Sequence, residues 1–207
     1  MNNVFIGIDP SINSTGLYII RNNIHKAYII RPNTKLNKKE KYAQENISDF
    51  DYVLYEKIDL KQFNDNNIVH ERYKTLNMIS IVDTIESTIR KELFRKKINN
   101  VYIIQEGISY GSSLRTKSIF DLAGLNYMIR ERFIKNPNYL FIIVTPSQVK
   151  KFASGNGNCK KDILIELYKS VHINHDCIPK IDDIADAYFM SLFGKYVYEN
   201  KDKLDII

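Results

Sequence analysis

The apolar residues of the chain fall into short runs whose spacing predicts alternating strands and helices. The runs at residues 4–9, 16–20 and 24–30 are nearly continuous in apolar residues, which favours buried strands. Asn22 and Asn23 separate the second run from the third and predict a tight turn. We therefore expect the chain to open with an antiparallel meander of three strands.

Helical spacing dominates the middle and the end of the chain. Between residues 67 and 97 the apolar positions recur every three or four residues, which predicts one long helix with a single buried face. Two further runs, at 101–106 and 140–144, predict strands, and the unbroken hydrophobicity of the second is typical of a buried strand. Helices are also expected at 112–134 and 182–200.

The segment after residue 144 carries local signals for a short helix and for its end. Thr145 is suited to cap the helix, Pro146 to fill its first position, and Gln148 to complete a capping box. The polar, glycine-containing residues 154–158 then break the helix, and a new helix is expected to start near Lys160.

The segment 31–66 lacks clear periodicity. It is rich in Lys and Asn, so we expect an exposed excursion, although residues 52–55 could add a short strand. No internal repeat or linker divides the 207 residues. The prediction is therefore one α/β domain spanning 1–207, with a sheet flanked by helices.

Composition limits the class of protein further. The 30 Lys and Arg residues exceed the 24 Asp and Glu residues, giving a net charge of +6 and a pI near 9.1, as in proteins that bind polyanions. Two cysteines, Cys159 and Cys177, are too few for a disulfide framework. We find neither a signal peptide nor a membrane span in the sequence, so we expect a cytoplasmic protein without membrane contact.

Four acidic residues stand where the predicted elements would bring them together. Asp9 ends the first apolar run and Glu106 ends the run at 101–106. If these strands are neighbours, their carboxylates meet at one end of the sheet. Asp183 and Asp186 lie three residues apart in the last helix, so they can face the same site.

Converging carboxylates repel one another unless cations neutralise them. Mg²⁺, with Mn²⁺ as a substitute, prefers such oxygen ligands, and two ions about 4 Å apart can drive phosphodiester hydrolysis. Singly, Asp9 could open a turn, and Asp182 or Asp183 could favour a helix start. Asp186 lies beyond capping distance, so the four acids together favour metal, with Asp9 as the bridge between ions and Asp182 in reserve.

These motifs resemble the RuvC-type Holliday-junction resolvases, including bacteriophage members, within the ribonuclease H-like superfamily. Residues 7–16 resemble the opening strand and turn, although Ser11 stands where many members have glycine. Residues 104–106 resemble the second acidic motif, and 183–187 match the closing Asp-x-x-Asp. Residues 145–161 resemble the segment that carries two functional lysines.

The resemblance implies a ribonuclease H-like fold with a five-stranded mixed sheet, and a homodimer that resolves four-way DNA junctions by paired nicks. Lys161 would be catalytic together with the four acids, and Lys150 would also face phosphate. The remaining candidates for DNA contact are neighbouring lysines and residues after the second acid, where Tyr110 is shifted from the family's wedge position: Lys151, Lys160, Tyr110, Arg115 and Lys117.

Other functions share part of this pattern. A ribonuclease H-like enzyme that cuts RNA–DNA hybrids would have the same acids, and a non-catalytic module could bind branched DNA. A sugar-kinase-like or actin-like ATPase would need two domains, for which 207 residues are too few. A zinc site at His172, His175 and Cys177 has only three donors, which favours ordinary loop residues.

Overall fold

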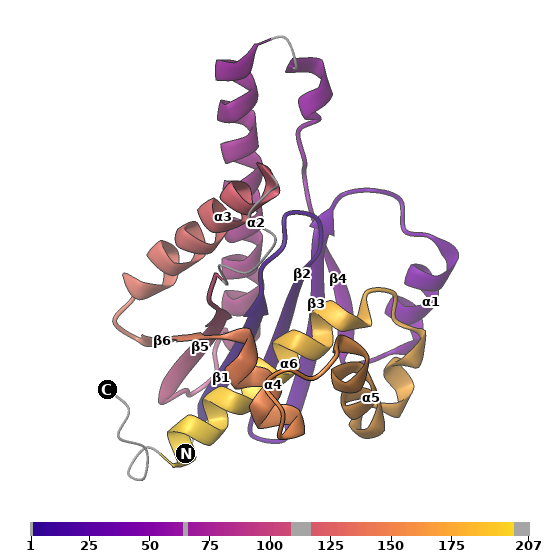
Figure 1. Cartoon of the computed structure of the whole chain (residues 1–207), viewed down its shortest axis with the longest axis vertical. Coiled ribbons are helices and arrows are strands. Elements are labelled where there is room, and N and C mark those ends of the chain that lie inside the picture. The colour runs from indigo at the N-terminus through magenta and orange to yellow at the C-terminus, as the bar shows by residue number, and fades with distance from the viewer. Residues whose placement is uncertain (1, 64–65, 109–116, 201–207) are drawn as a thin grey trace.

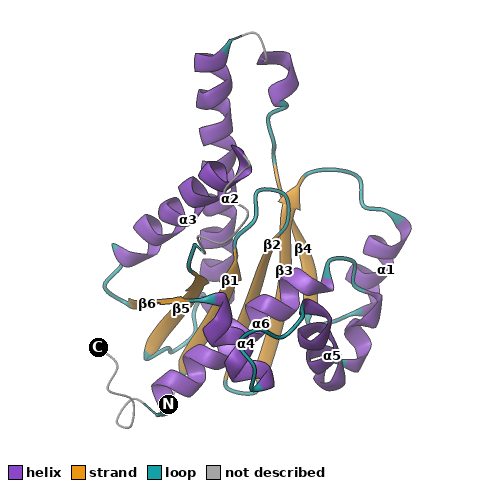
Figure 2. Cartoon of the chain, viewed as in Figure 1, coloured by secondary structure: helices purple, strands orange, loops and turns teal. Residues whose placement is uncertain are grey.

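The computed structural model describes residues 2–63, 66–108 and 117–200, and its centre is a six-stranded mixed sheet with the order β4-β3-β2-β1-β5-β6 (Figures 1 and 2). The strands are β1 (Asn3–Asp9), β2 (Thr15–Arg21), β3 (Ile24–Pro32), β4 (Phe50–Tyr55), β5 (Asn100–Glu106) and β6 (Tyr139–Val144).

The first three strands form the expected antiparallel meander, and β5 pairs in parallel with β1. Strand β6 continues in parallel beyond β5, and β4 pairs in parallel with β3. The α/β class and the mixed sheet are thus confirmed. The sheet has six strands rather than five, because the residues near 52–55 do form an added edge strand.

Helices cover both faces of the sheet (Figure 1). One face packs against α6 with α4 and α5 beside it, and the other packs against α2 and α3. The helices are α1 (Lys38–Asn46), α2 (Asn67–Leu93), α3 (Lys117–Ile134), α4 (Pro146–Ser154), α5 (Lys161–Val171) and α6 (Ile181–Glu199), with 3-10 turns η1 (Leu60–Phe63) and η2 (Ile173–Cys177).

Alternate residues of the central strands therefore enter two separate cores. On β1, Phe5 packs on the α6 side, whereas Ile6 and Ile8 pack on the α2 and α3 side. Burial on both faces explains why the strand reads as a continuous apolar run in the sequence. In the described part of the chain, no helix is both long and apolar enough to cross a membrane.

Helix α4 has the ends that its sequence predicts. Thr145 Oγ1 accepts a hydrogen bond from the Gln148 amide at 3.2 Å, and Gln148 Oε1 accepts one from the Thr145 amide at 2.8 Å. Gly155 ends the helix with φ near +78°, a left-handed conformation that favours glycine. The capping box and the glycine stop are both confirmed.

Two expectations about exposure are wrong. The segment 31–66 is not simply an excursion, because α1 buries Ala43 and its Glu40 forms a sheltered ion pair with Arg31 of β3. Strand β6 is not buried on both faces, since Leu140 and Ile143 remain 48% and 49% exposed. It lies at the edge of the sheet, and residue pattern alone does not distinguish an edge strand from a central one.

Two glycines allow α6 to lie directly on the sheet. A Cβ at Gly7 of β1 would overlap the carbonyl oxygen of Ala187, and a Cβ at Gly16 of β2 would overlap the carbonyl oxygen of Asp183. Backbone therefore meets backbone at both positions. These contacts set the distance of α6 from the sheet, and with it the position of the acids on this helix.

We expect Gly7→Ala to lower the free energy of unfolding by about 3 kcal/mol, because the new methyl group has no space beneath α6. The matched control is Gly124→Ala in α3, where a Cβ would lie 3.7 Å from Met78 Sδ, an ordinary contact. Because alanine favours helix, this control should gain up to about 1 kcal/mol. Urea unfolding followed by circular dichroism measures both, and unchanged stability in Gly7→Ala would contradict the packing.

Candidate active site

Asp9 and Glu106 end neighbouring parallel strands. The register pairs Ile8 with Gln105, so the two acids follow side by side at the same end of the sheet. The side chain of Gln105 is fully buried and its Nε2 donates to Asn126 Oδ1 of α3 at 2.7 Å. This bond fixes the end of β5 against the helix behind it.

Helix α6 brings the other two acids to the same end of the sheet. Asp183 lies in its first turn and Asp186 one turn further. Ser14, just before β2, donates a hydrogen bond from Oγ to Asp183 Oδ2 at 2.5 Å. Together with the close approach of Gly16, this bond holds the start of α6 over the end of the meander.

The electrostatics of the four carboxyl groups show that they share one environment. Burial raises the pKa of Asp9 well above its ordinary value, and the charges of Asp186, Glu106 and Asp183 raise it further. Burial and the charge of Asp186 raise the pKa of Glu106 to about 7. Burial also raises the pKa values of Asp183 and Asp186. Ionised together, the four groups oppose folding unless cations compensate them.

Lys161 supplies part of the compensating charge. Its Nζ lies 2.9 Å from Asp182 Oδ2 and 3.7 Å from Asp186 Oδ2. Burial acts to lower the pKa of Lys161, but the hydrogen bond to Asp182 and the charge of Asp186 outweigh it, so this pKa is raised. Lys150 also acts on the acids, because its charge lowers the pKa values of Glu106 and Asp186.

A cleft of about 280 Å³ opens beside these groups. It combines two acids and two lysines with an apolar lining from α4, α5 and α6: Glu106, Asp186, Lys150, Lys161, Pro146, Val149, Leu164 and Met190. Negatively charged carboxylates and positively charged lysines thus lie together on one surface.

The donor set fits a hard divalent cation. Carboxylate oxygens are the ligands that Mg²⁺ and Mn²⁺ prefer, and their repulsion gives an ion a reason to bind. Over the described ranges, however, no three of the four acids each bring one oxygen within 4.8 Å of the others. An ion would therefore have to draw the side chains inward.

The remaining residues predicted to contact DNA fall into two groups, those whose side chains the structure describes and those whose side chains it does not. Lys151 and Lys160 are exposed and do not line the cleft, and Lys160 precedes α5 as its N-cap residue. Tyr110 and Arg115 lie outside the described residues, and for Lys117 only the backbone, at the start of α3, is described. The DNA contacts of these residues stay predictions.

The sequence missed the role of one residue of the site and gave another a different role. Ser14 belongs to the opening motif, but only the fold places it against Asp183, which is 169 residues away. Asp182, kept in reserve as a ligand, instead pairs with Lys161. The signal that could have pointed to Ser14 is the antiparallel pairing of the first two strands. Its register places Asp9 opposite Gly16, so Ser14 lies near the end of β1 that carries the first acid.

No protein-family model matches the chain, and no curated protein matches it. Among solved structures, it is similar to RuvC of Thermus thermophilus at 16% identity and TM-score 0.47, covering 96% of each chain. It is also similar to T. thermophilus RuvC in complex with a Holliday junction substrate, at 16% identity and TM-score 0.45, again over 96% of each chain. A third is the yeast mitochondrial Holliday junction resolvase Ydc2, at 13% identity and TM-score 0.47, covering 96% of this chain and 83% of that chain.

The raised pKa values predict how metal-free stability depends on pH. The pKa of Glu106 rises from 4.5 to about 7 on folding, so the folded state retains protons that the unfolded state releases. This contribution to stability is present below about pH 4.5 and is lost as the pH rises through 7. Asp9→Asn removes one of the repelling charges, so at pH 8 with chelator the variant should be more stable by on the order of 2 kcal/mol.

The measurement is urea unfolding of both proteins from pH 5 to pH 8, with and without Mg²⁺. The difference should grow with pH in chelator and shrink or reverse with Mg²⁺, because the ion then stabilises the intact site. Glu166→Gln, an exposed acid on α5, is the control and should show no such trend. A wild-type chain that is the more stable of the two at pH 8 in chelator would contradict the electrostatic description.

Proposed function

We propose that the chain is a divalent-metal-dependent endonuclease that cleaves four-way DNA junctions by paired nicks. The observation that carries this proposal is the convergence of Asp9, Glu106, Asp183 and Asp186 beside a cleft that also contains two lysines. Buried acids that repel one another destabilise the fold, and a site of this kind is more readily explained by metal chemistry than by packing.

In the proposed mechanism the carboxylates of Asp9, Glu106, Asp183 and Asp186 would hold two Mg²⁺ ions. Bound there, the ions would supply activation of a water and stabilisation of the leaving 3′ oxygen, giving 5′-phosphate and 3′-hydroxyl ends. Ser14 orients Asp183 through its 2.5 Å hydrogen bond. Lys161 is held by Asp182 at the cleft, where its ammonium group can stabilise negative charge on the reacting phosphate.

The proposed substrate is inferred from the residues that lie beside the four acids. Lys150 and Lys161 line the cleft, and residues 145–161, which contain both, resemble the lysine-bearing segment of the RuvC-type resolvases. A four-way junction has two equivalent scissile phosphates, so a two-fold homodimer would place one protomer at each. The acids alone would serve equally well on RNA–DNA hybrids, which makes that substrate the alternative to test. Their retention argues against a module that only binds DNA.

The decisive experiment offers the purified chain three labelled substrates: a four-way junction, a linear duplex of the same sequence, and an RNA–DNA hybrid. We expect paired nicks in the junction with Mg²⁺ or Mn²⁺ and none with chelator. Asp9→Asn should reduce cleavage by about 10³-fold or more while leaving junction binding measurable, because it removes a carboxylate that would hold the metal ions. Cleavage of the hybrid alone, or full activity in Asp9→Asn, would overturn the proposal.

A second test concerns the lysine at the cleft. Lys161→Gln should slow junction cleavage about 100-fold, because it removes a cation that would stabilise charge in the transition state. Lys195→Gln is the control: this lysine lies near the other end of α6 and pairs with Glu199 at 3.9 Å. Single-turnover rates with saturating enzyme separate the chemical step from binding. Equal rates for Lys161→Gln and the wild type would remove Lys161 from the catalytic site.

A further inference from the structure

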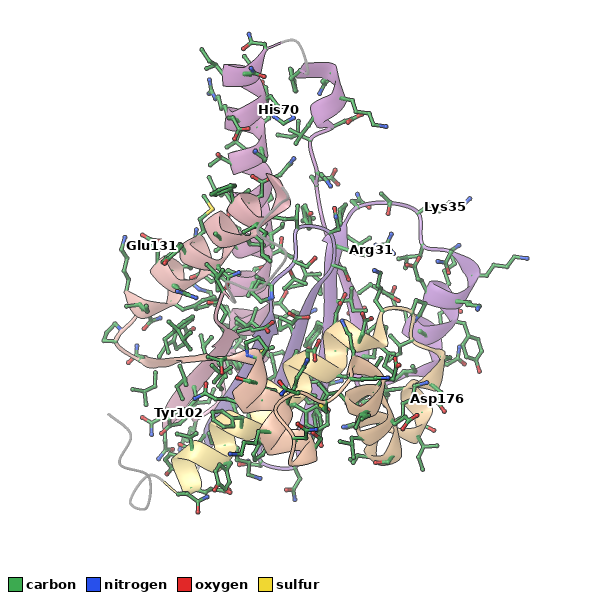
Figure 3. The ribbon with its side chains drawn as sticks, viewed as in Figure 1. Arg31, Lys35, His70, Tyr102, Glu131 and Asp176 are labelled. Atoms are coloured by element: carbon green, nitrogen blue, oxygen red, sulfur yellow. The ribbon has the colours of Figure 1, made fainter. Side chains whose placement is uncertain are left out.

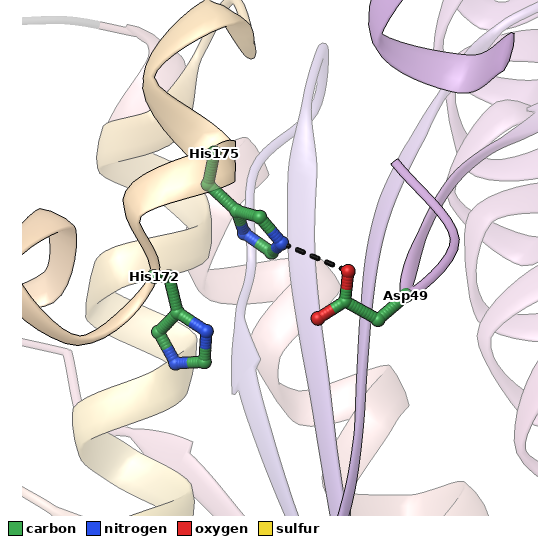
Figure 4. Close-up of side chains that lie close together, drawn as sticks. All are labelled: Asp49, His172 and His175. Atoms are coloured by element: carbon green, nitrogen blue, oxygen red, sulfur yellow. Dashed lines mark hydrogen bonds and ion pairs between the residues drawn. The ribbon is translucent and has the colours of Figure 1, made fainter. Parts of the chain in front are cut away.

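A second group of side chains with potential metal-ligating atoms lies away from the four acids. Asp49, His172 and His175 each bring one potential ligand atom within 4.8 Å of the others (Figure 4). Asp49 directly precedes β4, His172 ends α5, and His175 lies in the η2 turn. The segments are far apart in the sequence, and His175 Nε2 lies 3.1 Å from Asp49 Oδ1 across 126 residues.

Both imidazole rings are oriented from behind by tyrosine hydroxyls. Tyr168 OH lies 2.5 Å from His175 Nδ1, and Tyr18 OH lies 3.2 Å from His172 Nε2. Each histidine thus uses one nitrogen for a bond to a tyrosine hydroxyl, while the second nitrogen of His175, Nε2, already faces Asp49 Oδ1 at 3.1 Å. Figure 4 shows both rings on the same side of Asp49, each with a nitrogen turned toward its carboxylate. Metal-binding histidines are held in this way by a partner on the second nitrogen.

The protonation state of His172 suits ligation. Burial lowers the pKa of His172 to about 4, and the neighbouring rings of His175 and His25 lower it further, so His172 is neutral at neutral pH. Burial also raises the pKa values of Tyr18 and Tyr168 above their ordinary range, so both hydroxyls stay protonated and act as hydrogen-bonding partners. Two imidazoles beside an aspartate are a donor set typical of Zn²⁺.

We propose that Asp49, His172 and His175 form a site for Zn²⁺, in which Asp49 supplies the third protein ligand in place of Cys177 and water is the fourth ligand, as in zinc sites with three protein ligands. Two ligands of a tetrahedral zinc lie about 3.3 Å apart. The 3.1 Å between His175 Nε2 and Asp49 Oδ1 is already close to this separation. The competing arrangement is a plain hydrogen bond from His175 to Asp49, in which His172 contributes no ligand.

The position of the site indicates what the ion would do. The η2 turn leads through residues 178–180 into α6, which carries Asp183 and Asp186. An ion at Asp49, His172 and His175 would link the η2 turn to the turn before β4. It would therefore stabilise the segment that leads into α6. The site is separate from the four acids, and the inference does not depend on the proposed nuclease activity.

The test uses the full chain, stripped of metal with chelator and titrated with Co²⁺ in the presence of excess Mg²⁺. Tetrahedral Co²⁺ with nitrogen ligands absorbs strongly in the visible range, whereas Co²⁺ bound octahedrally by carboxylates and water absorbs weakly. We expect one equivalent of strongly absorbing Co²⁺ that Zn²⁺ displaces. We also expect Zn²⁺ to raise the melting temperature of the chain when Mg²⁺ is already saturating.

Three variants locate the ligands. His172→Asn and His175→Asn should each lose the absorption and the Zn²⁺-dependent rise in melting temperature. Asp49→Asn, at a side chain that is 36% exposed, should weaken binding without unfolding the chain, which guards against a failure to fold in the histidine variants. His70→Asn is the matched control, because His70 lies on α2 at the far end of the molecule from the η2 residue Asp176 (Figure 3).

Two results would overturn the site. The first is a wild-type chain that gives no strong visible band with Co²⁺ and no Zn²⁺-dependent rise in melting temperature. The second is a band that persists in His172→Asn, since the hydrogen-bonded alternative gives this residue no role in binding a metal.

Discussion

The contact between the backbone of α6 and the backbones of β1 and β2 is the constraint on which the rest of the structure depends. Gly7 and Gly16 leave no side chain between the helix and the sheet, and Ala187 and Asp183 of α6 occupy the space above them. Two acids reach the site from the sheet and two from the helix. Their convergence therefore requires the short distance between α6 and the sheet. A larger residue beneath the helix would move one pair of acids away from the other.

Bringing the four acids together is electrostatically unfavourable. Asp9 is held among three other acids at the edge of a buried core, and its pKa rises as a result of burial first and of like charges second. Lys161 and Ser14 relieve part of the conflict through contacts with Asp182 and Asp183. Sites that bind metal commonly retain such a conflict, because the ion gains affinity from the repulsion that it removes.

Local signals made much of this structure predictable. The capping box of Thr145 and Gln148 and the long periodic run of α2 depend on residues within a few positions of each other, and both elements form as expected. The positions of Asp9 and Glu106 were predictable because each acid ends an apolar run. Features that depend on distant residues were not: the exposure of β6, the ion pair that anchors α1, and the meeting of Asp49 with the two histidines.

The close packing of α6 also determines which evolutionary changes the chain can accept. Gly194, further along the same helix, lies against Ile104 of β5 so closely that a Cβ there would overlap its side chain. Inserting or deleting one residue within α6 would rotate everything beyond it by about 100°. The glycine contacts and the acids would then fall on different sides of the helix. Variation in length among related chains should therefore be confined to loops, while α6 diverges by substitution alone.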